Sequence, residues 1–362
     1  MTRRAKSGLA AALALALLVG FALLFDRQPS AGGEQKYSVV WFDVFDTVTT
    51  LTGYADSEQT WNAQSEALHQ DLLRYHRLFD IYHHYDGITN LADVNAAAGA
   101  GPVVVDDEIF SLLQFAQQMY GTTDGACNVA AGAVLTLWHD AREAAATAES
   151  ATAAVLPTGK ALQAAAQHCA MQDLLLDQSA GTVAFADPEM TLDVGSIGKG
   201  YAVEMAARAA EARGLTSALL NAGGNVRAIG AKPDGKPWTA GVENPWPDAA
   251  GNYSTAASLA TVALAPGESL VISGDYQRYF TVDDVRYHHL IDLTTLQPAR
   301  HMTSVAVRCA SSALGDALST GLFCMPTAAG QALVARLDGV EALWMLADGT
   351  TLASAGWQTS EP

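Results

Sequence analysis

Short β-rich stretches and helical stretches follow one another irregularly along this chain, and that order constrains its fold more than any other feature. Residues 36–54 are rich in Val, Thr and aromatic side chains, as in one long strand or a hairpin. Residues 56–80 have helical spacing, and residues 106–170 are mostly helical, with breaks near Gly121–Asn128 and at Pro157. Regular strand–helix alternation would indicate a parallel sheet. This pattern instead predicts an α+β fold with a mainly antiparallel sheet and packed helices.

The second half of the chain alternates short strands with helices. Two short strands are expected at 174–177 and 182–185, and a hairpin over 276–292 is expected to turn at Asp283-Asp284. Helical spacing recurs in three segments: 203–212, 314–325 and 327–337. Because no linker is evident after residue 36, we expect residues 34–362 to form one domain, preceded by a separate segment at 1–33.

The first 33 residues have the pattern of an export signal. Arg3, Arg4 and Lys6 precede the uncharged apolar run Gly8–Phe25. At 1.5 Å per residue this run reaches about 27 Å, close to the hydrocarbon thickness of about 30 Å. The run is longer than most cleavable apolar regions, so we expect an uncleaved signal anchor in preference to a cleaved signal. A buried core helix is disfavoured because it would leave the flanking charges unexplained. The positive-inside rule then places the body on the extracytoplasmic side of the cell membrane.

The charge balance limits the partners of the protein. Asp and Glu number 38 against 20 Lys and Arg, which gives a net charge of −18. Such a body repels phosphate backbones, so we expect no nucleic-acid partner. An anionic ligand would need a metal cation or helix N-termini to offset this field.

Two glycine-rich segments have the composition of ligand-binding turns. In Thr191–Tyr201 (TLDVGSIGKGY), a strand is expected to run into a turn with three glycines and then into an Ala-rich helix. Glycines let backbone N–H groups approach a ligand, and a helix N-terminus binds anions. Asn221–Gly230 (NAGGNVRAIG) has a Gly-Gly turn flanked by amide side chains. Each segment could equally be an ordinary tight turn, with Lys199 solvated in the first.

The segment Ser311–Met325 is expected to be a helix with a carboxylate and a hydroxyl on one face. Asp316 and Thr320 are four residues apart, so they lie one above the other on the helix. Two oxygen ligands in this relation suit a hard cation such as Mg²⁺. The alternative is a Thr320 hydroxyl bonded to the carbonyl of Asp316, with the Asp316 carboxylate exposed. The flanking residues are apolar, however, and a carboxylate among them needs a partner.

The segment 288–298 (HHLIDLTTLQP) contains a histidine and an aspartate close together. His289 and Asp292 could act as a base and the carboxylate that orients it. A polar pair across two strands is the alternative, and the sequence pattern alone favours it.

Taken together and in this order, these segments resemble the FAD:protein FMN transferase (ApbE) family. The family's patterns are similar to five segments of this sequence: Leu192–Ala202, Asn221–Pro245, Ser273–Arg278, His289–Pro298 and Gly315–Thr320. The N-terminal signature of the family resembles Phe45–Val48, with Phe79–Tyr82 following the first helix. One such motif has little specificity, whereas several in the family's order, spread over roughly 37–355, are specific.

The resemblance implies an ApbE-like fold and an Mg²⁺-dependent transferase. FAD would be cleaved at its pyrophosphate, and its FMN part would pass to a Thr or Ser hydroxyl of a client protein while AMP leaves. Clients in the family are Rnf-type subunits, subunits of the Na⁺-pumping NADH:quinone reductase (Nqr-type) and extracellular flavoproteins. The alternatives are an Mg²⁺-dependent FAD pyrophosphatase giving FMN and AMP, a non-catalytic flavin-binding carrier, and a surface interaction module with a vestigial pocket.

The resemblance also implies roles for individual residues. Asp316 and Thr320 would hold the metal, with Ser196 completing the site through its backbone carbonyl. His289 would accept the proton of the client hydroxyl, so His289 and Asp316 are the expected catalytic residues. The expected flavin-nucleotide contacts are Phe45, Tyr82, Gly125, Ala126, Cys127, Asn128, Asp193, Lys199, Leu290 and Ile291.

The chain departs from the family pattern in three places. Phe45 stands where many members have Met. Asn128 and Ala130 replace an Asp and a Thr, so contacts at 125–128 are expected to rely on backbone more than on side chains. The turn at 292–296 lacks the family's Pro and Gly, which alters the turn beside His289.

Overall fold

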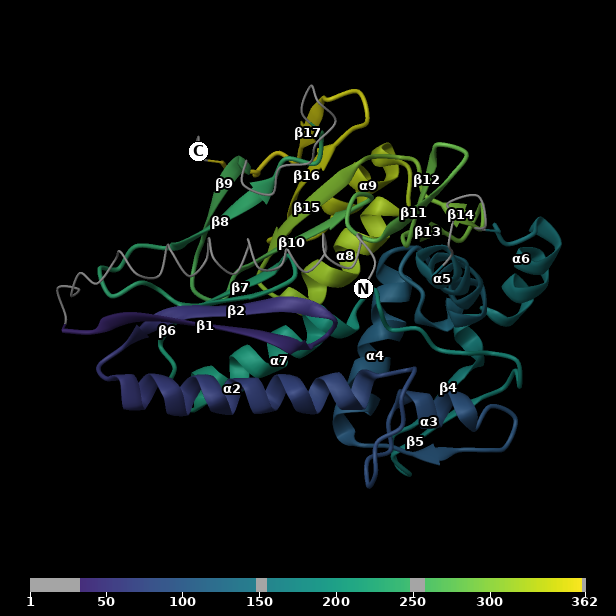
Figure 1. Cartoon of the computed structure of the whole chain (residues 1–362), viewed down its shortest axis with the longest axis horizontal. Coiled ribbons are helices and arrows are strands. Elements are labelled where there is room, and N and C mark those ends of the chain that lie inside the picture. The colour runs from purple at the N-terminus through teal and green to yellow at the C-terminus, as the bar shows by residue number, and fades with distance from the viewer. Residues whose placement is uncertain (1–32, 148–154, 248–257, 360–362) are drawn as a thin grey trace.

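The computed structural model describes residues 33–147, 155–247 and 258–359 (Figure 1). The signal anchor expected at 1–33 therefore lies outside the described residues, apart from Gly33. Within the ranges that the structure describes, no helix is long and apolar enough to cross a membrane.

An eight-stranded antiparallel sheet forms the centre of the fold (Figure 1). Its strands, in spatial order, are β1 (Gln35–Val44), β2 (Thr47–Ala55), β6 (Ser217–Ala222), β7 (Asn225–Gly230), β10 (Ser269–Gly274), β15 (Ser304–Cys309), β16 (Glu341–Met345) and β17 (Thr351–Ala353). Every neighbouring pair is antiparallel. The predicted α+β class with a mainly antiparallel sheet is confirmed.

Helices cover one face of this sheet, and a hairpin covers the other. The covering helices are α2 (Glu58–Phe79), α7 (Gly198–Ala212), α8 (Ser312–Phe323) and α9 (Thr327–Val334). Apolar side chains of α2 and α7 pack on β2 and β6 in one buried cluster that includes Leu68, Val203 and Leu220. On the opposite face, β8 (Trp238–Glu243) pairs with β9 (Ser258–Leu264) and packs against β7, β15 and β16.

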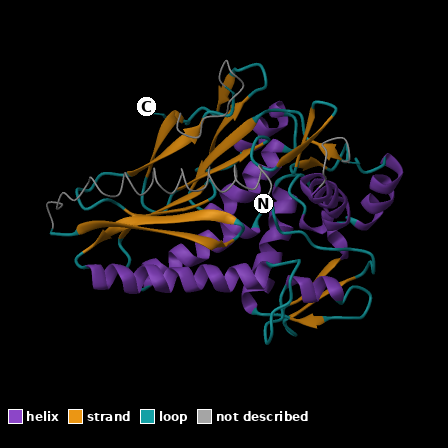
Figure 2. Cartoon of the chain, in the orientation of Figure 1, coloured by secondary structure: helices purple, strands orange, loops and turns teal. Residues whose placement is uncertain are grey.

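A second group of small elements adjoins one end of the large sheet (Figure 2). Its helices are α3 (Leu91–Ala96), α4 (Asp107–Thr122), α5 (Gly132–Thr147) and α6 (Gly159–Ala165), with 3₁₀ turns at Val129–Ala131, Ala166–His168 and Met171–Asp173. Its strands are β3 (Val103–Val104), β4 (Leu174–Asp177), β5 (Thr182–Phe185), β11 (Tyr279–Val282), β12 (Val285–His288), β13 (Ile291–Asp292) and β14 (Gln297–Pro298). Phe280 and Ile291 pack against Trp138 of α5, which joins the β11–β12 hairpin to the helices.

Most of the expected elements occur where the sequence predicts them. The first β-rich stretch is the β1–β2 hairpin, and β4 and β5 have the predicted bounds. The β11–β12 hairpin turns at Asp283-Asp284, both of which have positive φ. The sequence starts α7 at residue 203, whereas the helix begins at Gly198.

The strand predicted before the glycine-rich turn is wrong. The segment 191–194 has no regular secondary structure and joins no sheet. The Asn95 side chain donates to the carbonyl of Leu192 (3.0 Å) and accepts from its N–H (2.8 Å). The N–H of Asp193 donates to the carbonyl of Val129 (2.8 Å). These bonds satisfy the backbone groups that a neighbouring strand would otherwise pair, so the segment needs no ladder.

Candidate active site

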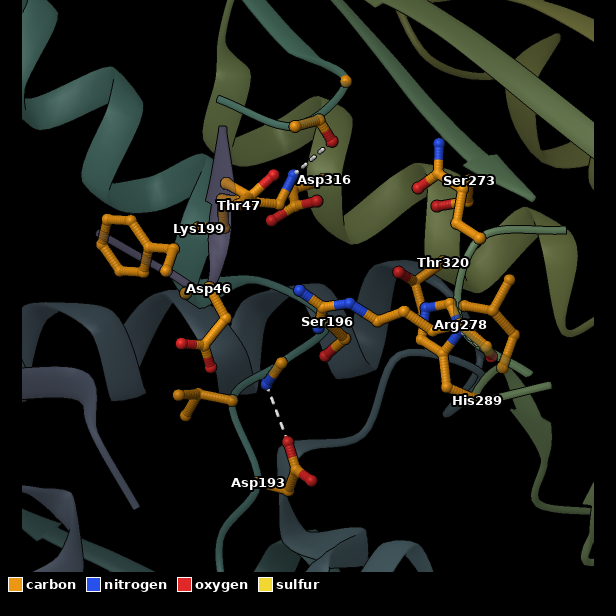
Figure 3. A pocket seen from close by; sticks show the side chains of 18 of the residues that line it. Asp46, Thr47, Asp193, Ser196, Lys199, Ser273, Arg278, His289, Asp316 and Thr320 are labelled. Atoms are coloured by element: carbon orange, nitrogen blue, oxygen red, sulfur yellow. Dashed lines mark hydrogen bonds between the residues drawn. The ribbon is translucent and has the colours of Figure 1, made fainter. Parts of the chain in front are cut away.

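One cavity of about 1350 Å³ collects side chains from distant parts of the chain (Figure 3). It lies where the β1–β2 turn, the turn before α7, the β6–β7 turn and α8 meet the small elements beside the sheet. The predicted site residues that line it are Phe45, Tyr82, Ala126, Asn128, Asp193, Ser196, Lys199, His289, Leu290, Ile291, Asp316 and Thr320. The other two predicted residues, Gly125 and Cys127, are not in its lining.

Lys199 joins the two glycine-rich turns. Its Nζ donates to the carbonyls of Ala222 (3.2 Å) and Gly223 (3.4 Å) in the β6–β7 turn. Burial lowers the pKa of Lys199, while the charge of Asp316 opposes that shift. The alternative of a solvated lysine in an ordinary turn is therefore wrong, because the ammonium is held inside the cavity.

The β6–β7 turn also touches the β1–β2 turn. The N–H of Gly223 donates to the carbonyl of Val48 (3.2 Å). A Cβ at Gly223 would lie 2.1 Å from Oγ1 of Thr47, and φ here is +53°. Only glycine combines that backbone conformation with that close approach.

Asp316 is buried beside the glycine-rich turn. Its side chain is 6% exposed, and Oδ2 accepts the N–H of Gly200 at 2.7 Å. Burial raises the pKa of Asp316, whereas the positive charge of Lys199 lowers it. A Cβ at Gly200 would lie 2.3 Å from the Cβ of Asp316, so α7 and α8 approach this closely only because residue 200 is glycine. The alternative of an exposed carboxylate is wrong.

A second contact, one helical turn away, fixes α8 against α7. The carboxylate of Glu204 is 1% exposed and accepts the N–H of Ser312, the first residue of α8, at 2.8 Å. It also accepts from Nε of Arg227 (3.1 Å) and Nε of Arg208 (2.7 Å). Burial tends to raise the pKa of Glu204, but the Arg227 hydrogen bond and charge hold it below its usual value. The start of α8 is thus fixed by a buried ion pair.

The oxygen groups on α8 fit a hard cation. Thr320 lies one turn after Asp316 and lines the same cavity, with Ser196 in the turn opposite (Figure 3). The hydroxyl of Ser319 donates to the carbonyl of Asp316 (3.1 Å). The alternative from the sequence had assigned this hydrogen bond to the hydroxyl of Thr320. No group of three or more His, Cys, Asp or Glu suited to a metal occurs among the described residues. One carboxylate with hydroxyl and carbonyl oxygens suits Mg²⁺, which keeps several waters, and does not suit Zn²⁺.

Two aromatic side chains stand at the cavity walls. Tyr82 stacks on His139 of α5 with ring centroids 5.0 Å apart, and its N–H donates to Oδ1 of Asp80 (2.7 Å). Phe45 contacts the ring of His76 edge-on and donates its N–H to Nδ1 of that histidine (3.2 Å). Phe45 has φ of +55°, an unusual conformation for a bulky residue, so this turn stores backbone strain at the site.

In the loop at 125–128, the side chains of Asn128 and Cys127 bond within the protein. The Asn128 amide donates to the carbonyl of Cys169 (2.9 Å) and accepts from the N–H of Ala130 (2.9 Å). Cys127 is 1% exposed and donates its S–H to Oγ of Ser196 (3.6 Å). Gly125 forms the turn itself, with φ of +85°. Gly125 and Cys127 thus support the cavity wall from behind.

His289 lies on the opposite side of the cavity from the Asp193 loop (Figure 3). Its Nδ1 is 3.3 Å from the carbonyl of Arg278. A carbonyl only accepts, so Nδ1 carries the proton and Nε2 is left as an acceptor. Burial, followed by the charge of Arg278, lowers the pKa of His289 to about 3. The imidazole is therefore neutral at physiological pH.

His289 bonds to the carbonyl of Arg278 and Asp292 bonds elsewhere, so the expected pairing of His289 with Asp292 is wrong. Asp292 accepts from the N–H and hydroxyl of Thr294 (2.8 and 2.6 Å), and its carbonyl accepts the N–H of Leu296 (2.7 Å). Leu296 has φ of +60°, the conformation that a glycine would otherwise supply. The aspartate side chain thus closes this turn without Pro or Gly.

The cavity lining also contains residues that were not predicted as site residues, among them Asp46, Thr47, Ser273 and Arg278 (Figure 3). The sequence places them in segments that resemble family motifs, but it assigns them no role. Asp46 and Thr47 follow the strained turn at Phe45, and Oγ of Ser273 lies 2.8 Å from Oγ of Ser319 on α8. Only proximity in the fold shows that these side chains face the same space.

The sequence of this chain is similar to those of known proteins. The sequence profile of the ApbE family matches residues 45–344. The FAD:protein FMN transferase of Treponema pallidum is 34% identical over 280 residues, which cover 74% of this chain and 73% of that protein. A FAD:protein FMN transferase of Klebsiella pneumoniae is 28% identical over 277 residues, covering 74% and 81%.

Solved structures give the same result for the fold. The crystal structure of the ApbE protein from Thermotoga maritima superposes with a TM-score of 0.75 at 28% identity, covering 89% of this chain and 97% of that one. The flavin transferase ApbE from Vibrio cholerae superposes with a TM-score of 0.72 at 23% identity, covering 89% and 98%. At 23% identity, the similarity to the Vibrio cholerae structure is evidence for the fold alone.

Proposed function

The chain belongs to the ApbE family, and from that membership we propose that it is a FAD:protein FMN transferase. It transfers the FMN part of FAD to a Thr or Ser hydroxyl of a client protein, and AMP leaves. The observation that carries this proposal is that a buried carboxylate, a partly buried ammonium and a neutral imidazole line one cavity: Asp316, Lys199 and His289. The ammonium suits a diphosphate, the carboxylate suits the metal cation that would accompany it, and the imidazole suits the acceptor hydroxyl.

FAD is the proposed occupant of this cavity. Its volume of about 1350 Å³ exceeds that of most small-molecule pockets, which run to about 1,000 Å³, so a dinucleotide and an acceptor side chain both have room. The rings of Phe45 and Tyr82 offer flat apolar surfaces to the ring systems of the ligand. Leu290 and Ile291 are each 5% exposed and give a firm apolar wall.

Asp316, Thr320 and the Ser196 turn would hold Mg²⁺ beside the diphosphate. When bound there, the cation offsets the negative charge that grows on the phosphate oxygens as the bond breaks. It would also offset the acidic field of a chain with a net charge of −18.

His289 has the protonation state that a base needs. Its Nε2 would accept the proton of the client hydroxyl as the hydroxyl oxygen bonds to the FMN phosphorus. The bond from that phosphorus to the bridging oxygen breaks, and the bridging oxygen leaves as part of the AMP phosphate. The proton passes from His289 to solvent, so FAD and the hydroxyl give the FMN ester, AMP and one proton.

The clients and the location of the protein extend the same proposal. The clients would be Rnf- or Nqr-type subunits or extracellular flavoproteins, because such proteins carry FMN on Thr or Ser. Residues 1–33 would anchor the catalytic domain, 34–362, to the extracytoplasmic face of the cell membrane, which the basic residues before Gly8–Phe25 support.

The test combines the purified protein with FAD, Mg²⁺ and a candidate client. Flavin fluorescence of the client after denaturing electrophoresis, together with release of AMP, is the expected result. Asp316→Ala should abolish both while circular dichroism remains unchanged, and Asp338→Ala, which removes an exposed aspartate after α9, should leave both intact. Unchanged transfer by Asp316→Ala would refute the metal assignment. AMP and free FMN without a labelled client would instead indicate a FAD pyrophosphatase.

A further inference from the structure

Arg278 extends into the middle of the cavity from the loop between β10 and β11. Figure 3 shows its side chain running from the side that carries His289 and Thr320 toward the turn that carries Ser196. The loop that carries Arg278 holds none of the predicted metal ligands. Since Lys199 lines the same cavity, Arg278 is a second cationic side chain there.

The guanidinium of Arg278 has no anionic partner within the part of the chain that the structure describes. Among the described residues, no carboxylate oxygen lies within 4.0 Å of it, whereas nearby Arg286 pairs with Asp275 at 3.1 Å. Lys199 likewise bonds to carbonyl oxygens. Unpaired cations pointing into a shared cavity are unusual in a chain with 38 acidic residues, and they indicate a bound anion.

The charge of Arg278 acts on both chemical parts of the site. It lowers the pKa of His289, and it also lowers the pKa of Lys199 and that of Asp316. Its backbone carbonyl is the group that orients His289, at 3.3 Å from Nδ1. Arg278 thus lies between the proposed base and the proposed metal ligands, where the phosphorus under attack must lie.

We propose that Arg278 is a catalytic residue whose guanidinium binds the FMN phosphoryl group during its transfer. This inference rests on the proposed function. A planar guanidinium can donate two parallel N–H bonds to two oxygens of one phosphate, which a lysine ammonium cannot do.

The reason for the rate effect is the charge on the transferred group. As the acceptor oxygen bonds to phosphorus and the bridging oxygen departs with AMP, negative charge is spread over the non-bridging oxygens of the FMN phosphate. A fixed positive donor placed there stabilises the transition state more than the ground state. The carbonyl of the same residue holds His289 by its Nδ1–H, so one loop positions both the base and the charge.

The experiment compares substitutions at Arg278 with a charge-matched control. Arg278→Gln should lower kcat about 10²- to 10³-fold, the range measured for loss of one transition-state donor, with less than a tenfold change in the KM for FAD. Arg278→Lys should have a kcat between those of Arg278→Gln and the wild type, since lysine keeps the positive charge but lacks the two parallel N–H donors of the guanidinium. Arg300→Gln is the control, because Arg300 lies outside the cavity lining and donates to the carbonyl of Arg286.

Chemical rescue separates a catalytic role from a structural one. Arg278→Ala should regain activity on addition of millimolar guanidinium or ethylguanidinium ion, and Asp316→Ala should not. FAD binding, followed by flavin fluorescence quenching, should change little in Arg278→Gln.

Three outcomes would overturn the inference. They are a kcat of Arg278→Gln within threefold of the wild type, a loss confined to FAD affinity, and an equal loss in Arg300→Gln. If the wild type labels a client or hydrolyses FAD while Arg278→Gln keeps full activity, the proposed function holds and only this inference fails. A wild-type protein that does neither refutes both.

Discussion

Gly200 shows how one missing side chain positions the site. A Cβ there would lie 2.3 Å from the Cβ of Asp316 and 2.5 Å from the carbonyl of Ser312. Neither neighbour is the flexible end of a long side chain, so the helices themselves would have to move apart. The hydrogen bond from the Gly200 N–H to Asp316 depends on that closeness.

Gly200→Ala should therefore lower both stability and transfer. Overpacking of this kind costs about 1–3 kcal/mol, and a displaced Asp316 should reduce kcat more than the loss of folded protein explains. Chemical unfolding and FMN transfer check the two effects. Gly121→Ala is the control, since a Cβ at Gly121 meets nothing within 4 Å and the change should be neutral or slightly stabilising. Equal behaviour of the two variants would contradict the close-packing argument.

His289 gives a pH prediction at the same scale. Burial lowers its pKa to about 3 in the folded protein, against about 6.5 for an ordinary histidine. A catalytic histidine with an ordinary pKa would make log(kcat/KM) decline below about pH 6.5. Because the folded state keeps the imidazole of His289 neutral, we expect no such decline. The pH–rate profile with FAD varied checks this, and an acidic limb at pH 6.5 that disappears in His289→Gln would contradict it.

The same shift makes the folded protein sensitive to acid. Below pH 6.5 the unfolded chain binds a proton at His289 that the folded chain does not bind until the pH nears 3. The free energy of unfolding should therefore fall as the pH is lowered from about 6.5 toward 3. His289→Gln should show a smaller fall over that window in urea unfolding, and an identical fall in both proteins would show that His289 is exposed to protonation in the fold.

At the scale of elements, the pairing of α7 with α8 sets the geometry of the site. Two backbone N–H groups, of Gly200 and Ser312, each donate to a carboxylate of the other helix. Arg227 of β7 neutralises the carboxylate of Glu204, so the strand beneath also takes part. A substitution that shifts α8 at this contact should therefore also displace Thr320, which lies on the same helix.

Removing Glu204 should be strongly destabilising. Glu204→Ala leaves Arg227, which is 3% exposed, without its carboxylate, and breaking a buried pair in this way costs about 3–5 kcal/mol. The surface pair of Arg74 and Glu108 (3.0 Å) provides the comparison, since Glu108→Ala should cost at most about 1 kcal/mol. Urea unfolding of the two variants measures both, and similar losses would contradict the role given to the buried pair.

At the scale of the whole molecule, the cavity lies between the large sheet and the small elements at its end. Its walls come from the β1–β2 turn near the N-terminal end of the sheet and from α8 near the C-terminal end of the chain. A ligand that fills it contacts both groups of elements. Ligand binding should therefore raise the free energy of unfolding of the large sheet and of the small elements together.

FAD together with Mg²⁺ should raise the melting temperature. A ligand at 100 times its Kd adds about 2.7 kcal/mol to the free energy of unfolding. Differential scanning fluorimetry with FAD alone, Mg²⁺ alone and both ligands should give the largest shift with both, and Asp316→Ala should lose the extra shift that Mg²⁺ adds. An equal shift with and without Mg²⁺ in the wild type would contradict the proposed metal site.

Local patterns in the sequence were sufficient for many of the helices and strands. Asp316 and Thr320 share a face because four residues make about one helical turn, and the Asp283-Asp284 turn follows from local turn chemistry. The resemblance to a family then placed twelve of the fourteen predicted site residues around one cavity. The strand predicted at 191–194 failed, because a side chain from Asn95 supplies the hydrogen bonds that a strand would have needed.

What only the tertiary structure decided are the contacts between distant positions. Gly200 meets Asp316 across 116 positions of the chain, and Ser312 meets Glu204 across 108. Arg278 faces the cavity because its loop follows β10, whereas Cys127 is turned behind the wall toward Ser196. Residue spacing encodes what lies within one turn of a helix or one hairpin. The approach of two helices to the distance that a glycine permits depends on how the whole chain packs, and at that distance the N–H of Gly200 reaches the carboxylate of Asp316.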